Sequence, residues 1–156
     1  MGSNERVFSE DDPALRPGWM LLEFLMGIGA DEFAVRFLYA GKEKERCDRL
    51  KAKLDIASIG ERRRECTVWQ ENDRWREIEV WRLDRESVEM LKEVMPGVMG
   101  LVDWEGAWAE DLCVYRGWEL VFGTVTHERW AFLRLSEDQW RRWEEFRRER
   151  RADGAG

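Results

Sequence analysis

The sequence holds few of the residues that build metal centres and nucleophilic sites. His127 is the only histidine, and the cysteines at 47, 66 and 113 are far apart and form no CxxC pair. Zinc sites and disulfide frameworks need ligands at short, regular spacing. We therefore expect no metal, no cofactor and no disulfide framework. Thiols without such a framework are typical of a reducing compartment, which predicts a cytoplasmic protein.

Long apolar runs and the familiar catalytic motifs are also missing. The most apolar stretch, 19–30, is interrupted by Glu23 and is too short to span a bilayer. Acidic residues precede it where a signal peptide would carry positive charge. The chain contains no GxGxxG, Walker A, GxSxG or HExxH motif. The sequence therefore predicts no membrane anchor and offers no motif that indicates an enzyme.

Lysine is scarce, although charge is abundant. Five lysines leave 21 of the 26 basic residues as arginine, charged residues make up 38% of the 156 positions, and the net charge is −7. An acidic balance argues against nucleic acid as a partner, because phosphate binding is driven by cations. A nucleic-acid partner would need the arginines to gather on one face.

The chain also has ten tryptophans. Tryptophan and arginine are enriched at the energetic centres of protein interfaces, although a GC-rich genome explains the arginine equally well.

The hydrophobic pattern predicts an α+β fold, with a mostly antiparallel sheet of about six strands and helices packed on it. We expect a loose polar arm over 1–17, one domain over 18–150 and a disordered tail over 151–156. In 61–65, acids flank three arginines, which favours a solvated loop. Helices are expected near 19–26, 42–57, 85–95 and 137–150, and strands near 31–40, 65–70, 75–83, 111–115, 119–126 and 129–135.

The final third has the clearest pattern, that of a three-stranded antiparallel meander with turns at 116–117 and 127–128. A turn centred between 127 and 128 places Gly123 opposite Phe132, whose ring would cover the bare backbone. The same hairpin register pairs Leu120 with Leu135, Phe122 with Leu133 and Val125 with Trp130. The earlier turn sets Cys113 opposite Leu120. Both faces of this meander are apolar. Either helices cover both faces, or one face is an exposed patch that binds another molecule.

Two helix starts are also predicted by their capping residues. Asp84 is the expected N-cap of one helix, and Ser136 with Gln139 forms a capping box for another. Shifted by 52 positions, 80–94 matches the apolar pattern of 132–146. This match indicates either an internal ββα duplication or the pattern that any strand followed by a capped helix produces. Both interpretations stay open.

Two groups of residues raise the question of catalysis. His127 beside Glu128 has the composition of a base and its orienting carboxylate, but neighbours in a strand point to opposite faces, and in a turn both are solvated. We interpret His127 as the tip of a hairpin and assign no catalytic residue.

Segment 103–111 interleaves carboxylates with tryptophans, as glycoside hydrolases do. An enzyme or a carbohydrate or small-ligand binder is therefore the alternative, and an acidic loop pinned by its tryptophans is the simpler interpretation.

The acidic charge, the tryptophan and arginine content and the missing motifs together predict a small acidic protein-binding module. A concrete version is an immunity or inhibitor protein that occludes a basic partner such as a toxin domain. The residues expected to contact that partner are Asp103, Trp104, Glu105, Trp108, Glu110, Asp111, Trp118 and Trp130.

Replacing Asp103 and Glu105 together by lysine should slow association with a basic partner, because two attractive charges become repulsive. The effect should be larger at low salt, where screening is weak. Stopped-flow association rates at low and high ionic strength measure it. An on-rate that does not change would count against this segment as the contact surface.

Overall fold

The computed structural model describes residues 4–9, 12–15, 18–37, 43–66, 75–94 and 109–153. In this part of the chain, seven strands form one sheet in the order β1-β7-β6-β5-β2-β4-β3, and every neighbouring pair is antiparallel. The strands are β1 (Asn4–Ser9), β2 (Glu32–Phe37), β3 (Ser58–Glu65), β4 (Trp75–Arg82), β5 (Ala109–Arg116), β6 (Glu119–Val125) and β7 (Trp130–Leu135). The helices are α1 (Gly18–Gly27), α2 (Glu43–Leu54), α3 (Arg85–Val94) and α4 (Glu137–Ala152), with 3-10 turns η1 (Pro13–Leu15), η2 (Asp55–Ala57) and η3 (Thr126–Glu128). The predicted α+β fold is confirmed.

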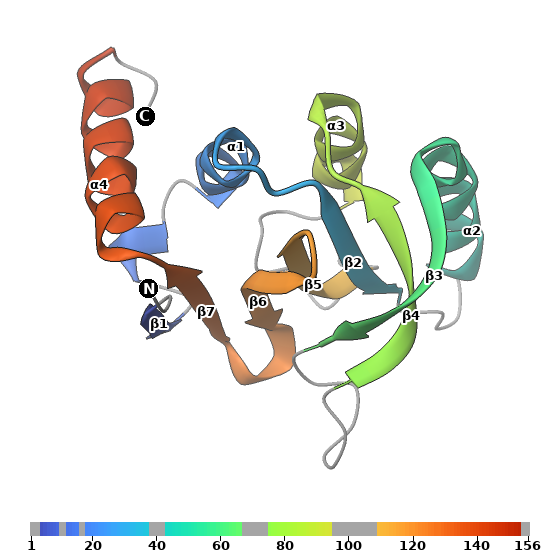
Figure 1. Cartoon of the computed structure of the whole chain (residues 1–156). Coiled ribbons are helices and arrows are strands. Elements are labelled where there is room, and N and C mark those ends of the chain that lie inside the picture. The colour runs from blue at the N-terminus through green and yellow to red at the C-terminus, as the bar shows by residue number, and fades with distance from the viewer. Residues whose placement is uncertain are drawn as a thin grey trace.

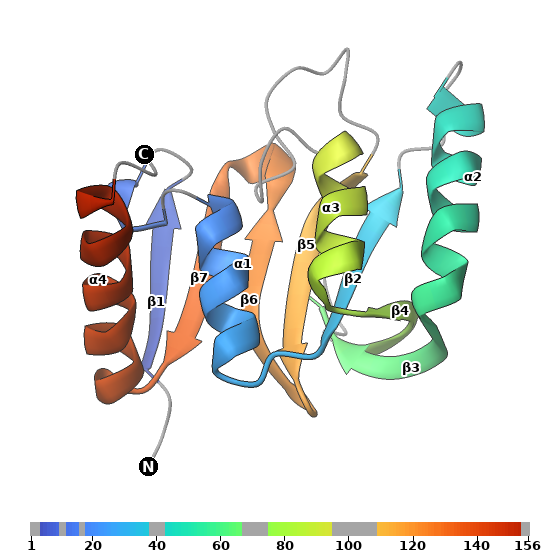
Figure 2. The same cartoon turned by 90° about the horizontal axis from the view of Figure 1, so that it is seen from above.

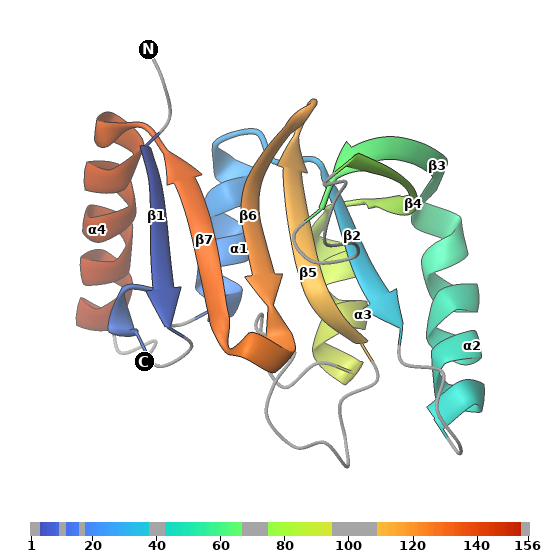
Figure 3. The same ribbon diagram turned by 90° about the horizontal axis from the view of Figure 1, so that it is seen from below.

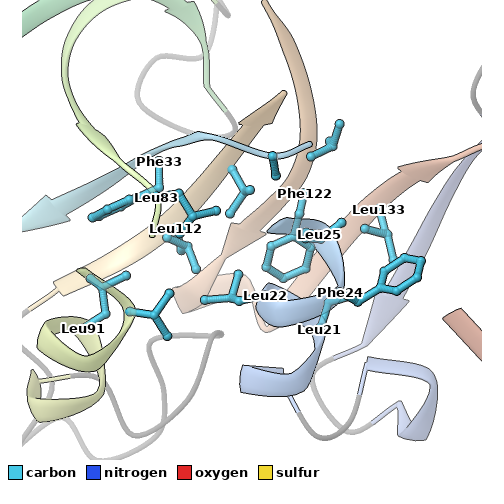
Figure 4. Packing of buried hydrophobic residues seen from close by; sticks show 14 of the residues in the cluster. Leu21, Leu22, Phe24, Leu25, Phe33, Leu83, Leu91, Leu112, Phe122 and Leu133 are labelled. Atoms are coloured by element: carbon cyan, nitrogen blue, oxygen red, sulfur yellow. The ribbon is translucent and has the colours of Figure 1, made fainter. Parts of the chain in front are cut away.

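All four helices lie on one side of the sheet (Figure 1), in a row that Figure 2 shows from above. The apolar α1 is buried where it meets the central strands, and its leucines pack toward Phe122 and Leu133 (Figure 4). On the neighbouring helix α3, Leu91 points toward Leu112 of β5. Each such side chain that is fully buried contributes about 1.5–3 kcal/mol. No described helix is long and apolar enough to cross a bilayer.

On the opposite face, strands of the same sheet cover the part formed by β2 and β5. The β3–β4 hairpin curls over this part (Figures 1 and 3), β3 also contacts β6, and β4 pairs with β2 at only two positions, Glu32↔Arg82 and Phe33↔Trp81. This short pairing lets the hairpin swing away from the plane of the other strands. A second apolar cluster is enclosed there, formed by Ala34, Cys66, Ile78, Val80, Cys113, Tyr115, Leu120 and Phe132. Both faces of the meander are therefore buried, one by helices and one by the hairpin, an arrangement that neither predicted alternative describes.

Arg134 and Tyr115 hold the end of β3 against the far side of the sheet. The Arg134 guanidinium donates two hydrogen bonds to the Glu65 carboxylate, at 3.0 and 3.1 Å, and a third to Glu5 of β1 at 2.7 Å. The Tyr115 hydroxyl donates to the Glu65 carbonyl oxygen at 2.7 Å. The bonds to Glu65 raise the pKa of Arg134, and burial raises the pKa of Tyr115. Both groups are therefore fixed in the protonated state that these bonds need.

The sequence-based expectations for β3 and for the N-terminus are corrected. Residues 61–65, expected as a solvated loop, belong to β3, where Arg64 turns inward to an acidic partner while 61–63 stay exposed. The strand expected at 65–70 begins at Ser58, and 67–70 lie outside the described residues.

Within 1–17, where a loose arm is expected, Asn4–Ser9 instead pair with β7 along their whole length. Phe8 anchors this strand by packing on Trp140, with ring centroids 5.7 Å apart.

The β5–β6 turn and the C-terminus also differ from expectation. Arg116 pairs with Glu119, so the turn residues are Gly117 and Trp118. A register shift between Val114 and Tyr115 then places Cys113 opposite Gly123 and not opposite Leu120. The predicted tail begins too early, because α4 continues to Ala152.

The β6–β7 register and both helix starts are confirmed. Gly123 lies opposite Phe132, and the predicted pairs Phe122↔Leu133 and Val125↔Trp130 are present. The fourth predicted pair, Leu120 with Leu135, lies beyond the observed register, which runs from Phe122 to Val125. The Ser136–Gln139 capping box forms in both directions, and Asp84 accepts a bond from the backbone N–H of Ser87 at 2.9 Å. The units β3–β4–α3 and β6–β7–α4 have the same element order, which both interpretations of the 52-residue offset predict.

Replacing Arg134 by methionine should lower the free energy of unfolding by about 1–3 kcal/mol, because the partly buried Glu65 carboxylate and the exposed Glu5 carboxylate lose their charged partner. Arg141→Met is the matched control, since it removes an ion pair with Asp138 that is exposed on both sides, and it should cost less than about 0.5 kcal/mol. Urea unfolding followed by tryptophan fluorescence measures both. Equal losses in the two variants would contradict a closing role for Arg134.

Candidate functional site

The predicted contact residues fall at two ends of the meander. Trp118 lies in the β5–β6 turn, whereas Trp130 begins β7 opposite Val125, the last residue of β6. A strand of this length separates them by about 20 Å. Glu110 and Asp111 lie near the start of β5, at the Trp130 end. The remaining four, Asp103, Trp104, Glu105 and Trp108, lie outside the described residues.

Glu110 and Asp111 are buried and engaged within the fold. The Glu110 carboxylate lies 3.6 Å from the guanidinium of Arg36. Asp111 donates its backbone N–H to the Thr126 hydroxyl at 2.9 Å, and its carboxylate accepts the Thr126 N–H at 3.0 Å. Asp111 has a φ of 54°, a left-handed conformation that costs about 1–2 kcal/mol outside glycine. These bonds tie the start of β5 to the β6–β7 turn.

His127 lies in that turn, within η3, so the hairpin-tip interpretation of its backbone is confirmed. Arg129 closes the turn in the left-handed region at a φ of 62°. The indole of Trp130 donates to Glu128 at 2.8 Å, a contact on the surface. This end of the meander is therefore organised by local bonds from its own residues.

Trp118 is the most exposed large apolar side chain of the described residues, at 72% of its maximum. One face of its ring is covered, because the Arg64 guanidinium lies 4.3 Å from the ring centroid. Arg64 itself is buried and donates to the Glu32 carboxylate at 3.0 Å. A cation held over an indole contributes about 0.5–2 kcal/mol. The exposed ring is thus stacked on a buried, ion-paired arginine.

The turn that carries Trp118 is fixed by Asp31. Gly117 has a φ of 58°, where glycine is favoured, and its N–H donates to the Asp31 carboxylate at 3.2 Å. The Asp31 backbone bonds on both sides, donating to the Tyr115 carbonyl at 3.0 Å and accepting from the Leu83 N–H at 2.8 Å. Arg116 and Glu119 close the turn with an ion pair of 3.1 Å. Trp118 is therefore both exposed and positioned in advance.

The sequence predicts Trp118 as a contact residue from its residue type, but it does not predict the residues that hold this side chain. Arg64 stands among charges of both signs, which resembles a solvated segment. Strand alternation is the signal that indicates an inward Arg64. Arg64 lies on the same strand face as Gly60, and Gly60 lies opposite the buried Val80. The role of Asp31 depends on contacts 86 positions away in the chain, at Gly117.

Comparison with models of protein families, with curated proteins and with solved structures gives no match. The candidate site is therefore defined by exposure, contacts and charge. Its residues are Trp118, Arg64, Glu32, Asp31 and Gly117, called the Trp118 platform below.

Asp31→Ala should speed hydrogen exchange at the Gly117 amide about 5- to 10-fold, because the loss of one hydrogen bond costs about 1 kcal/mol. Asp31→Asn keeps an acceptor oxygen and should change the exchange much less. Residue-resolved exchange by NMR measures both variants. If Gly117 exchanges equally fast in the wild type and in Asp31→Ala, Asp31 does not fix the turn.

Proposed function

We propose that this chain is a protein-binding module that docks on its partner through the Trp118 platform. The observation that carries the proposal is a 72% exposed indole that rests on a buried, ion-paired arginine. Tryptophan and arginine are the residues that most often dominate binding energy in interfaces. A side chain already held in place loses little conformational freedom on binding, so more of its contact energy becomes affinity.

The acidic balance of the chain supports a basic partner. A net charge of −7 gives a long-range attraction that speeds encounter with a cationic surface. The finer form of the proposal is an immunity or inhibitor protein that occludes a basic partner such as a toxin domain. A cytoplasmic location belongs to the same proposal, and it is supported by three buried cysteines of which none forms a disulfide.

Two other functions receive less support from the described residues. An enzyme that acts through 103–111 would need carboxylates that reach a substrate. The two described carboxylates of this segment, Glu110 and Asp111, are instead buried and bonded to Arg36 and Thr126.

For nucleic-acid binding, the arginines would need unpaired charge. At least nine described arginines instead form ion pairs with carboxylates, namely 6, 36, 64, 82, 116, 134, 141, 147 and 150. Neutralised arginines do not favour a phosphate surface.

The protein used as bait in native lysate should retain a basic partner, and Trp118→Ala should weaken the purified complex at least tenfold, or about 1.4 kcal/mol. Val7→Ala is the matched control, because this apolar side chain is also exposed, at 64%, and lies in β1, which β7 and β6 separate from β5. Titration calorimetry measures both affinities, and thermal unfolding checks that both variants fold. A complex that is as tight with Trp118→Ala as with the wild type contradicts the proposal, and an acidic partner contradicts its electrostatic part.

A further inference from the structure

Helices α1 and α4 leave a groove between them in the helix layer. The two helices are neighbours at one end of the row of helices (Figures 1 and 2). The groove has a volume of about 400 Å³, and its walls come from 23–28 of α1 and 142–149 of α4. Ligand sites in proteins have volumes of about 300–1,000 Å³. The groove is therefore large enough to receive a side chain of a partner.

Apolar side chains form part of the surface of this groove. Phe24 is buried, and its ring centroid lies 5.3 Å from that of Trp143 and 5.8 Å from that of Phe146. Phe146 and Ile28 line the groove and are partly buried against the core. Gly27 adds no side chain, and a Cβ at its position would meet no atom within 4 Å. An apolar stem placed here would lie on aromatic surface that is already fixed, and it would leave water.

The charged residues of the groove are mainly acidic. Glu23, Glu145 and Glu149 line it, against the single cation of Arg142. Arg150 pairs with Glu23, and with this second guanidinium included the three carboxylates still leave a negative sum. Glu145 and Glu149 form no ion pair with the described residues. They lie one turn apart on α4, where two like charges repel. A cation is therefore the occupant that the charge of the groove favours.

Arg150 indicates which kind of cation suits this surface. Its guanidinium carbon lies 5.1 Å from the centroid of the Phe146 ring, and the same group donates to the Glu23 carboxylate. The chain itself thus places a guanidinium on an aromatic ring beside a glutamate. Arginine suits this surroundings better than lysine, because its planar group stacks on rings and can donate two parallel hydrogen bonds to a carboxylate.

We propose that the α1–α4 groove binds an arginine side chain of a basic partner protein, with the guanidinium at Glu145 and Glu149. The aliphatic stem of arginine packs on apolar surface while its charged head stays at the polar rim, and here Phe146 supplies that surface. Arg142 leaves this end of the groove acidic, because it lies about 10 Å along the helix axis from Glu149. An acidic side chain would instead meet three glutamates.

This groove is separate from the Trp118 platform and does not depend on the function proposed for it. The groove lies in the helix layer, whereas Arg64, which supports Trp118, belongs to the hairpin on the opposite face (Figure 1). A second copy of the chain is a poor occupant, because each copy carries a net charge of −7 and the two repel.

The probe is the peptide acetyl-Ala-Leu-Arg-Leu-Ala-amide, compared with the same peptide in which citrulline, a neutral side chain of the same shape, replaces arginine. NMR titration of the full chain should show shifts centred on 23–28 and 142–149. The arginine peptide should bind about fivefold more tightly, because exposed ion pairs are individually weak. Trp118→Ala should leave both affinities unchanged, which separates this test from that of the platform.

Two variants of the groove should lose the preference for arginine. Glu145→Gln combined with Glu149→Gln should reduce the affinity for the arginine peptide to that for the citrulline peptide. Glu45→Gln combined with Asp48→Asn is the matched control, because it removes the same charge from exposed positions of α2, and it should leave the preference intact. Gly27→Leu should weaken binding of both peptides and still fold, since a side chain there meets open space.

Equal affinity for the two peptides overturns the proposal, as does a preference that survives neutralisation of Glu145 and Glu149. Shifts centred on Gly117 and Trp118 would place the peptide on the platform and overturn the groove. Free arginine amide that binds as tightly as the peptide would overturn it in favour of a small organic cation. Concentration-dependent dimerisation that shifts the groove signals without peptide would overturn it in favour of a second copy.

Discussion

The fold depends on burying the second face of the central strands. A meander that is apolar on both sides cannot leave one side in water, and the four helices occupy only one. The β3–β4 hairpin resolves this by bending over the other side, where the Arg134–Glu65 ion pair and the Tyr115 hydroxyl hold its end. Apolar burial supplies the driving force, and these directional bonds select one position of the hairpin.

The candidate site is a consequence of the same bend. Because β3 crosses the open face, Arg64 reaches both Glu32 of β2 and the ring of Trp118. Without the hairpin in this position, Trp118 would be an ordinary exposed turn residue. With it, one face of the indole is supported by a buried cation, and Asp31 fixes the backbone below. The core and the proposed interface are thus coupled through one strand, which explains how a polar, highly charged segment such as 61–65 comes to be structurally necessary.

The sequence predicts those features of the fold that depend on residues close together in the chain. The β6–β7 register and the Ser136–Gln139 box are set by residues a few positions apart, and alternation or capping chemistry reveals them. The closing contact between Glu65 and Arg134 spans 69 positions, and no local pattern signals it. For this reason the sequence predicts a loop at 61–65 and does not reveal that β3 covers the second face. The residue type of Trp118 predicts a contact residue, whereas its exposure and its support by Arg64 follow only from the tertiary structure.

The most direct test is hydroxyl-radical footprinting of the tryptophans with and without the purified partner. An exposed indole is oxidised readily, and one that is covered by a partner is protected. If the Trp118 platform is the contact surface, oxidation of Trp118 falls strongly in the complex while that of Trp19, a partly exposed tryptophan of α1 on the helix side of the sheet, stays the same. Oxidation of Trp118 at the same rate in the free and bound protein would contradict this account.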